Sequence, residues 1–317
     1  MDVLWLGLLG LLVTGWSVLD GAVLGLGASL RRIGRDGPER RLLLTALGPF
    51  LLGGEVWLVA TFGILIGAFP GLEKDLLSAY YPVVVGLVAS WILRDIGIWF
   101  RSRRPSPSWR RGWERVVVVA STTMPFAWGL LLGNVVQGVP TDGRPGVETL
   151  FGPYSLLWGA VVVAVFTLHG AVFAALRLPP GHRTRTAVTV RRSGMAALAL
   201  LAAVAVATPV FGAGLDRPLP AAVLGVAAAA AVLLALRLYE RGRDGWAYVC
   251  TAVAAAAPVL AAGVASAPRL LDGLATSGTL DLLAVVVAPL VPVLLAVQAW
   301  MWWTFRHRVG VGSAVFF

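Results

Sequence analysis

Five side chains that could do acid–base or ligand chemistry lie inside long apolar runs of this sequence. Asp20, Glu55, the adjacent pair Arg94 and Asp95, and His169 each interrupt a stretch that otherwise suits hydrocarbon. Charged groups inside a bilayer are costly and by default indicate function, such as a proton path or a polar ligand site. A buried ion pair that locks adjacent helices is the simpler explanation, because a paired charge costs far less than a lone one. We expect Arg94 to pair with Asp20 or Glu55, with the proton path or ligand site as the alternative.

The other candidates point to helix contacts rather than to chemistry. His169 is the one histidine in an apolar run, since His182 and His307 lie in polar sequence. We expect it to make a hydrogen bond between helices; an axial haem ligand is the alternative, and a haem held by two histidines of this chain is excluded. Asn134 and Gln137, in the segment GNVVQGVP, are expected to cap a helix end, with substrate binding as the alternative.

Motifs for other chemistry are missing from the sequence. There is no Walker motif, no convincing catalytic triad, and no spacing of residues typical of a metal site. Cys250 is the only cysteine, so an intramolecular disulfide is impossible. The sequence therefore predicts no catalytic residue and no metal site in this chain.

The elements that position these residues are expected to be transmembrane helices. Hydrophobic residues make up 58% of the chain and charged residues 13%, with a mean hydropathy of +0.82, whereas a soluble domain carries about 25% charged residues. The first run lacks basic residues at its start and is too long for a signal peptide, so we interpret it as a retained helix. Nine windows approach or exceed the roughly 20 residues that a spanning helix needs: 3–30, 41–69, 76–100, 116–138, 153–177, 193–213, 219–238, 246–267 and 280–305.

Basic residues alternate between the links in a way that predicts orientation. The segments 31–41, 101–115, 177–192, 237–243 and 306–308 hold 21 of the 26 basic residues, and the links between them hold only four. An excess of Arg on one side is typical of cytoplasmic loops. We therefore expect the N-terminus outside and the C-terminus in the cytoplasm. We therefore attribute the net charge of +10 to basic residues that orient the chain in a lipid bilayer. We do not expect nucleic acid as a partner.

A short repeated motif, called the echo below, indicates that the chain consists of two similar halves. Residues 19–23 (LDGAV) and 168–172 (LHGAV) are 149 positions apart, which is four spans and their links. Four is an even number, so both halves cross the membrane in the same direction. We predict an all-α membrane protein with two parallel four-helix bundles, residues 1–140 and 141–272, followed by a ninth helix and cytoplasmic tail, 273–317.

The order of several motifs, together with the nine-span layout, resembles subunit II of the cytochrome bd quinol oxidases. The segments that carry the resemblance are Asp20-Gly21, 34–41 (GRDGPERR), 53–58 (GGEVWL), 68–70 (AFP), Arg94 with Arg101, 109–114 (WRRGWE), 133–140 (GNVVQGVP), 153–159 (PYSLLWG), 168–173 (LHGAVF) and 298–308 (QAWMWWTFRHR).

The resemblance implies a membrane scaffold that binds no haem by itself. In this family subunit I carries haem b, haem d and the quinol site, and the two subunits together oxidise quinol, reduce dioxygen and generate a proton-motive force. In some members of the family, subunit II also holds a structural quinone or attaches small single-helix subunits. The expected location is the bacterial cytoplasmic membrane, with subunit I as the partner.

Three departures from the family pattern weaken the case for a proton route through this subunit. Acids that are usual in the family are replaced here by Val23, Leu52 and Trp99. The loss favours a role for Asp20 in holding helices together, with protons entering through subunit I. Two alternatives remain: a transporter that uses Asp20, Glu55 and Arg94 as a substrate path, and a non-enzymatic assembly paralogue.

Overall fold

The computed structural model describes residues 2–138, 147–211 and 215–310, and these residues are almost entirely helical. Twelve α-helices and one short 3₁₀ helix follow one another within the described ranges. They are α1 (Asp2–Ile33), α2 (Gly37–Ala68), α3 (Pro70–Ala79), α4 (Tyr81–Arg101), α5 (Pro107–Gln137), α6 (Val147–Leu150), α7 (Pro153–Arg177), η1 (Pro180–His182), α8 (Arg183–Phe211), α9 (Pro218–Glu240), α10 (Asp244–Ala265), α11 (Ala267–Leu271) and α12 (Ser277–Thr304).

Nine helices of the described chain are long and apolar enough to cross a bilayer, which confirms the nine predicted windows. Several helices extend beyond their windows at the Arg-rich end: α5 begins at Pro107 and α8 at Arg183. The windows measured hydropathy alone, whereas Arg is also a good helix former and continues the helix into the polar region. The window 76–100 began too early, because α3 ends at Ala79 and α4 starts afresh with Pro82 in its first turn.

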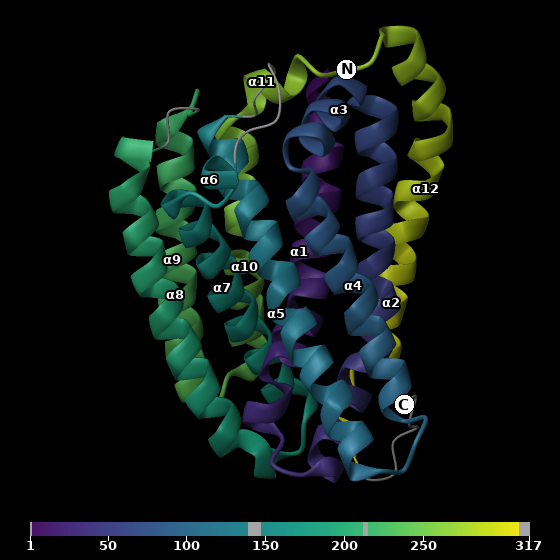
Figure 1. The fold of residues 1–317 in the computed structure, drawn as a ribbon, viewed down its shortest axis with the longest axis vertical. Helices are drawn as coiled ribbons and strands as arrows, with labels where there is room; N and C mark the ends of the chain where they lie inside the picture. The colour runs from purple at the N-terminus through teal and green to yellow at the C-terminus, as the bar shows by residue number, and fades with distance from the viewer. Residues whose placement is uncertain (1, 139–146, 212–214, 311–317) are drawn as a thin grey trace.

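The two helices that carry the sequence echo lie at the centre of the bundle. α1 packs on α2, α5, α7 and α10, and α7 packs on α5, α8 and α10 as well as on α1. α4 pairs with α5, and α9 pairs with α10. α12 lies at the outside against α2 (Figure 1), with Leu280 as its only fully buried side chain. The core of the molecule is therefore formed around α1 and α7.

The close crossing of α1 and α7 depends on two glycines. A Cβ at Gly25 would overlap the backbone carbonyl of Phe166, and a Cβ at Gly170 would overlap the backbone of Gly25 and Leu26. Small residues let membrane helices approach until their backbones touch. Gly170 belongs to the echo segment, so this part of the repeat has a packing role.

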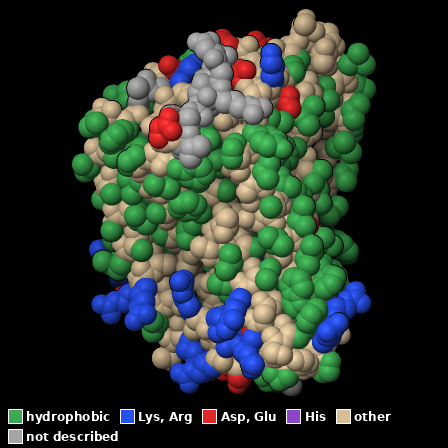
Figure 2. Space-filling model, in the orientation of Figure 1, with side chains coloured by type: hydrophobic (Ala, Val, Ile, Leu, Met, Phe, Trp, Pro, Cys, Tyr) green, Lys and Arg blue, Asp and Glu red, His purple; other side chains and the backbone are tan. Residues whose placement is uncertain are grey.

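Charge separates the two ends of the molecule. Figure 2 shows Lys and Arg side chains gathered at one end, an apolar band across the middle, and acidic groups mostly at the other end. The described termini lie at opposite ends, as an odd number of spans requires (Figure 1).

The predicted segment boundaries fall at two different kinds of place. The 140/141 boundary and the last two residues of the window 193–213 lie outside the described residues. The 272/273 boundary lies in the turn between α11 and α12. Packing of α1 on α7 and α10 joins the two predicted bundles into one continuous core.

Replacing Gly25 by Ala should destabilise the chain, because the added methyl group would force α1 and α7 apart. Overpacking of this kind costs about 1–3 kcal/mol. Thermal unfolding in detergent should therefore shift to lower temperature. Gly7→Ala is the matched control on the same helix, since nothing lies within 4 Å of a Cβ there. An equal effect of the two substitutions would contradict this account of the crossing.

Candidate functional site

Arg94 on α4 is the centre of a buried charge cluster. Its Nη1 donates to both carboxylate oxygens of Asp20 on α1, at 2.8 and 3.0 Å. Its Nη2 is bonded to Oε1 of Glu55 on α2, and its Nε donates to Oδ1 of Asp95 at 2.8 Å. Arg94 and Asp20 are both 0% exposed. The structure thus brings Arg94 to both of the acids that the sequence offered as alternatives, and ties α1, α2 and α4 together.

The surroundings of Asp20 complete its hydrogen bonding. Trp16, one turn earlier on α1, donates its indole N–H to Oδ2 at 3.1 Å. A Cβ at Gly54 would lie about 3.0 Å from the Asp20 Cβ, so the glycine lets α2 approach at this level. A carboxylate that accepts three hydrogen bonds, two of them from a cation, is strongly held.

Glu55 and Asp95 are less enclosed than Asp20. Their side chains are 12% and 26% exposed. The cluster also has three carboxylates for one guanidinium, which leaves acidic groups at its open edge. The arrangement can therefore hold helices together at Asp20 and can exchange a proton or meet a donor at Glu55 and Asp95.

Three positions at which the family resemblance led us to expect acids add no carboxylate to this cluster. Val23 is fully buried among apolar side chains. Leu52 is 65% exposed on α2 and Trp99 is 48% exposed on α4. Each of these positions carries an apolar or aromatic side chain.

His169 makes contacts between helices with both ring nitrogens. Nδ1 lies 2.7 Å from the Thr251 hydroxyl on α10, and Nε2 lies 3.0 Å from the Val18 carbonyl on α1. The ring stacks on Tyr248 with centroids 4.6 Å apart. The expected helix-contact hydrogen bond is thus present, and both nitrogens that could ligate a metal are engaged. His169 does not join the Arg94 cluster.

Asn134 and Gln137 lie at the last turn of α5, where the sequence expected polar groups at a helix end. Asn134 donates its side-chain amide to the carbonyls of Leu130 and Leu150, at 2.8 and 3.1 Å. Gln137 accepts from the Ser155 hydroxyl at 2.9 Å. The two side chains therefore link α5 to α6 and to the start of α7.

A second charge network, at the Arg-rich end, was missed from the sequence. Glu114 is 1% exposed and accepts from Arg101 at 2.8 and 3.0 Å and from Arg40 at 2.8 Å. Arg185 on α8 is bonded to Glu39 on α2. These residues lie in sequence that has the composition of exposed polar links, and Glu114 entered the sequence analysis only as part of the segment WRRGWE.

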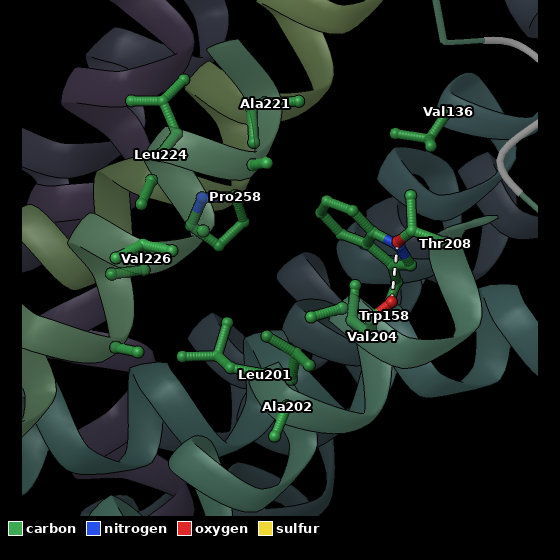
Figure 3. A pocket seen from close by; sticks show the side chains of 18 of the residues that line it. Val136, Trp158, Leu201, Ala202, Val204, Thr208, Ala221, Leu224, Val226 and Pro258 are labelled. Atoms are coloured by element: carbon green, nitrogen blue, oxygen red, sulfur yellow. Dashed lines mark hydrogen bonds between the residues drawn. The ribbon is translucent and has the colours of Figure 1, made fainter. Parts of the chain in front are cut away.

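A large apolar cavity of about 670 Å³ lies between helices of the second half. Residues of α7, α8, α9 and α10 line it, together with Val136 of α5 (Figure 3). Tyr154 and Thr208 share a hydroxyl hydrogen bond of 3.0 Å at its edge. The indole N–H of Trp158 is buried behind the lining and makes no hydrogen bond to any described residue, so the cavity presents mainly apolar side chains to a ligand.

The sequence profile described as cytochrome bd terminal oxidase subunit II matches residues 1–305. The chain belongs to the cytochrome bd terminal oxidase subunit II family. It is 26% identical to cytochrome bd-I ubiquinol oxidase subunit 2 of Escherichia coli K12 over 96% of this chain and 94% of the relative. It is 28% identical to cytochrome bd ubiquinol oxidase subunit 2 of Bacillus subtilis, over 96% of each chain.

The fold is shared with a solved member of the bd oxidases. The structure of bd oxidase from Geobacillus thermodenitrificans aligns with a TM-score of 0.76 at 17% identity, over 96% of this chain and 98% of that one. The predicted family is therefore confirmed, and the chain is a multi-pass membrane protein of the subunit II family.

Replacing Arg94 by Ala should lower the amount of folded protein in membranes. Asp20 would remain buried with only the Trp16 donor, and breaking one side of a buried ion pair costs about 3–5 kcal/mol. The measurement is the yield and thermal stability of the detergent-purified chain. Arg110→Ala is the matched control, because Arg110 is exposed at the start of α5. Normal yield of Arg94→Ala would contradict the anchoring role.

Proposed function

We propose that this chain is the haem-free subunit II of a bd-type quinol:oxygen oxidoreductase in a bacterial cytoplasmic membrane. Its role is to stabilise the haem-bearing subunit I, and the assembly oxidises quinol, reduces dioxygen to water and generates a proton-motive force. The observation that carries the proposal is the family match over residues 1–305. The engagement of both His169 nitrogens supports the division of labour, because the one intramembrane histidine is already used in helix packing.

The Arg94 cluster acts in this proposal as an anchor rather than as a proton relay. Three helices meet at one guanidinium that is 0% exposed. Val23 and Leu52 put apolar side chains where a relay would continue. Protons for water formation then enter through subunit I.

Cofactors of the assembly are assigned mainly to the partner. Haem b and haem d belong to subunit I, and this chain binds none alone. The apolar cavity of Figure 3 is our candidate site for a structural quinone, because its walls suit an isoprenoid tail. Small single-helix subunits are further candidate partners.

Charge and packing support the proposed orientation and repeat architecture. The Arg-rich end is the cytoplasmic end by the charge rule, so the N-terminus faces outward. The packing of α1 on α2 and α5 is matched by that of α7 on α8 and α10, and the α4–α5 pair is matched by α9–α10. This correspondence supports two parallel four-helix bundles.

The oxidase role is preferred to the two alternatives. A transporter would need the buried charges to contact a substrate, but Arg94 uses its Nε, Nη1 and Nη2 on carboxylates of this chain. A non-enzymatic assembly paralogue has the same structural features, and is separated from the oxidase subunit by its spectrum and oxygen consumption.

The division of labour predicts where haem is found. The chain expressed alone should show no haem absorption, and the chain purified with subunit I should show b- and d-type spectra. His169→Gln should leave the haem content of the complex unchanged. A haem spectrum from the isolated chain would overturn the proposal, and a complex without oxygen consumption would favour the assembly paralogue.

The orientation can be tested with single cysteines. In a Cys250→Ser background, Lys74→Cys places a thiol on α3 and Arg111→Cys places one near the start of α5; both native side chains are exposed. A membrane-impermeant maleimide added to spheroplasts should label the first variant at once and the second only after permeabilisation. The reverse pattern would show the opposite orientation.

A further inference from the structure

A small polar pocket lies at the Arg-rich end, away from both the Arg94 cluster and the apolar cavity. Its volume is about 230 Å³, well above the roughly 30 Å³ that one water occupies. Three segments that are distant in sequence meet around it: the link from α7 to α8, the turn from α9 to α10, and the tail after α12. The polar side chains in its lining are His182, Arg183, Asp244 and Arg308.

Backbone contacts hold the pocket together. The amide of Val309 in the tail donates to the Arg177 carbonyl at 2.9 Å, and Arg308 Nη1 donates to the Leu178 carbonyl at 3.0 Å. Gly242 has a φ of +75°, which glycine adopts without strain, and this conformation closes the turn before α10. The tail is therefore docked on the bundle and forms one wall of the pocket.

The pocket has an excess of positive charge. Arg183 Nη1 donates to both oxygens of Asp244 at 2.8 Å, and Arg308 Nη2 lies 3.7 Å from the same carboxylate. One acid is thus shared by two guanidinium groups, whose side chains are 39% and 44% exposed. His182 adds a buried Nδ1 with no hydrogen bond to any described residue.

Helix ends add to this charge. α8 begins at Arg183 and α10 begins at Asp244, so two helix N-termini lie beside the pocket. A helix N-terminus carries a partial positive charge and free amide groups, which favour anions. Together with two arginines, it makes a phosphate group the best-matched ligand.

The position of the pocket along the membrane normal indicates that the phosphate belongs to a lipid headgroup. Trp246, two residues after Asp244, is 60% exposed, and exposed tryptophans mark the headgroup region of a bilayer. Val249 and Val253, 50% and 49% exposed, continue from it along the apolar surface of α10. The pocket therefore lies where phospholipid headgroups meet acyl chains, on the face of the membrane that basic residues prefer.

We propose that this pocket binds the phosphate of an anionic phospholipid headgroup. Arg308 donates to the phosphate oxygens. Arg183, whose Nη1 and Nη2 are held by Asp244 and the Tyr239 carbonyl, adds positive charge, and the net positive charge selects an anionic lipid over a zwitterionic one. Because the tail supplies Arg308, the bound lipid also fastens the end of α12 to α7 and α10. Nothing in this proposal depends on the oxidase role.

Lipid binding to the delipidated protein, purified with any partner that accompanies it, tests the site. Phosphatidylglycerol is added to detergent micelles, and bound lipid is counted by native mass spectrometry. Arg308→Gln should weaken the tightest binding event at least about fivefold, the effect of one basic residue near the surface. This variant leaves Asp244 paired with Arg183 and keeps the backbone hydrogen bond from Val309 to Arg177, so we expect the tail to remain docked.

Arg306→Gln is the matched control, because Arg306 lies in the same tail, is exposed, and bonds only locally to the Trp303 carbonyl. It should bind phosphatidylglycerol as the unaltered chain does. Equal binding by the Arg308 and Arg306 variants would overturn the proposal. So would equal affinity for phosphatidylcholine with the same acyl chains. If inorganic phosphate displaced the lipid at equal concentration, the site would be one for free phosphate and the lipid assignment would be wrong.

Discussion

Neutralising one carboxylate inside a membrane is the constraint on which the first half of this molecule depends. Asp20 is 0% exposed and could not remain ionised there without a cation. Arg94 supplies the charge from α4, Trp16 supplies a further donor, and Gly54 lets α2 close over the pair. The packing of α1, α2 and α4 therefore depends on the same contacts that neutralise Asp20.

In the second half, the polar side chain at the equivalent position is hydrogen-bonded without an ion pair. His169 occupies the place in the echo that Asp20 has in the first half, yet it is satisfied by a hydroxyl on α10 and a carbonyl on α1. The two polar side chains thus reach in different directions: Asp20 binds within its own half, and His169 joins the halves. Together with the glycine crossing, they make α1 and α7 a rigid axis, a suitable property for a subunit whose proposed task is to support a catalytic partner.

Much of this arrangement could be predicted because membrane sequences carry few polar groups. Arg94 had only a handful of acids to pair with, and hydropathy located all nine spans. The partner of His169 could not be predicted, because threonines are common and any of several could have faced it. Glu114 was missed for a different reason: it lies in a charged link, where a buried acid looks the same as a solvated one. The docking of Arg308 near Asp244 depends on contacts between distant segments, which no local pattern records.

The separation of Asp20 and Arg94 by 74 residues has a consequence for biogenesis. At roughly 5–20 residues per second, α1 leaves the ribosome about 4–15 s before the guanidinium that neutralises its acid. During that interval the carboxyl group has no guanidinium partner, so it is protonated or stays in contact with water. Burial of Asp20 as a carboxylate therefore depends on α4, which couples the final placement of α1 to a helix that is inserted later.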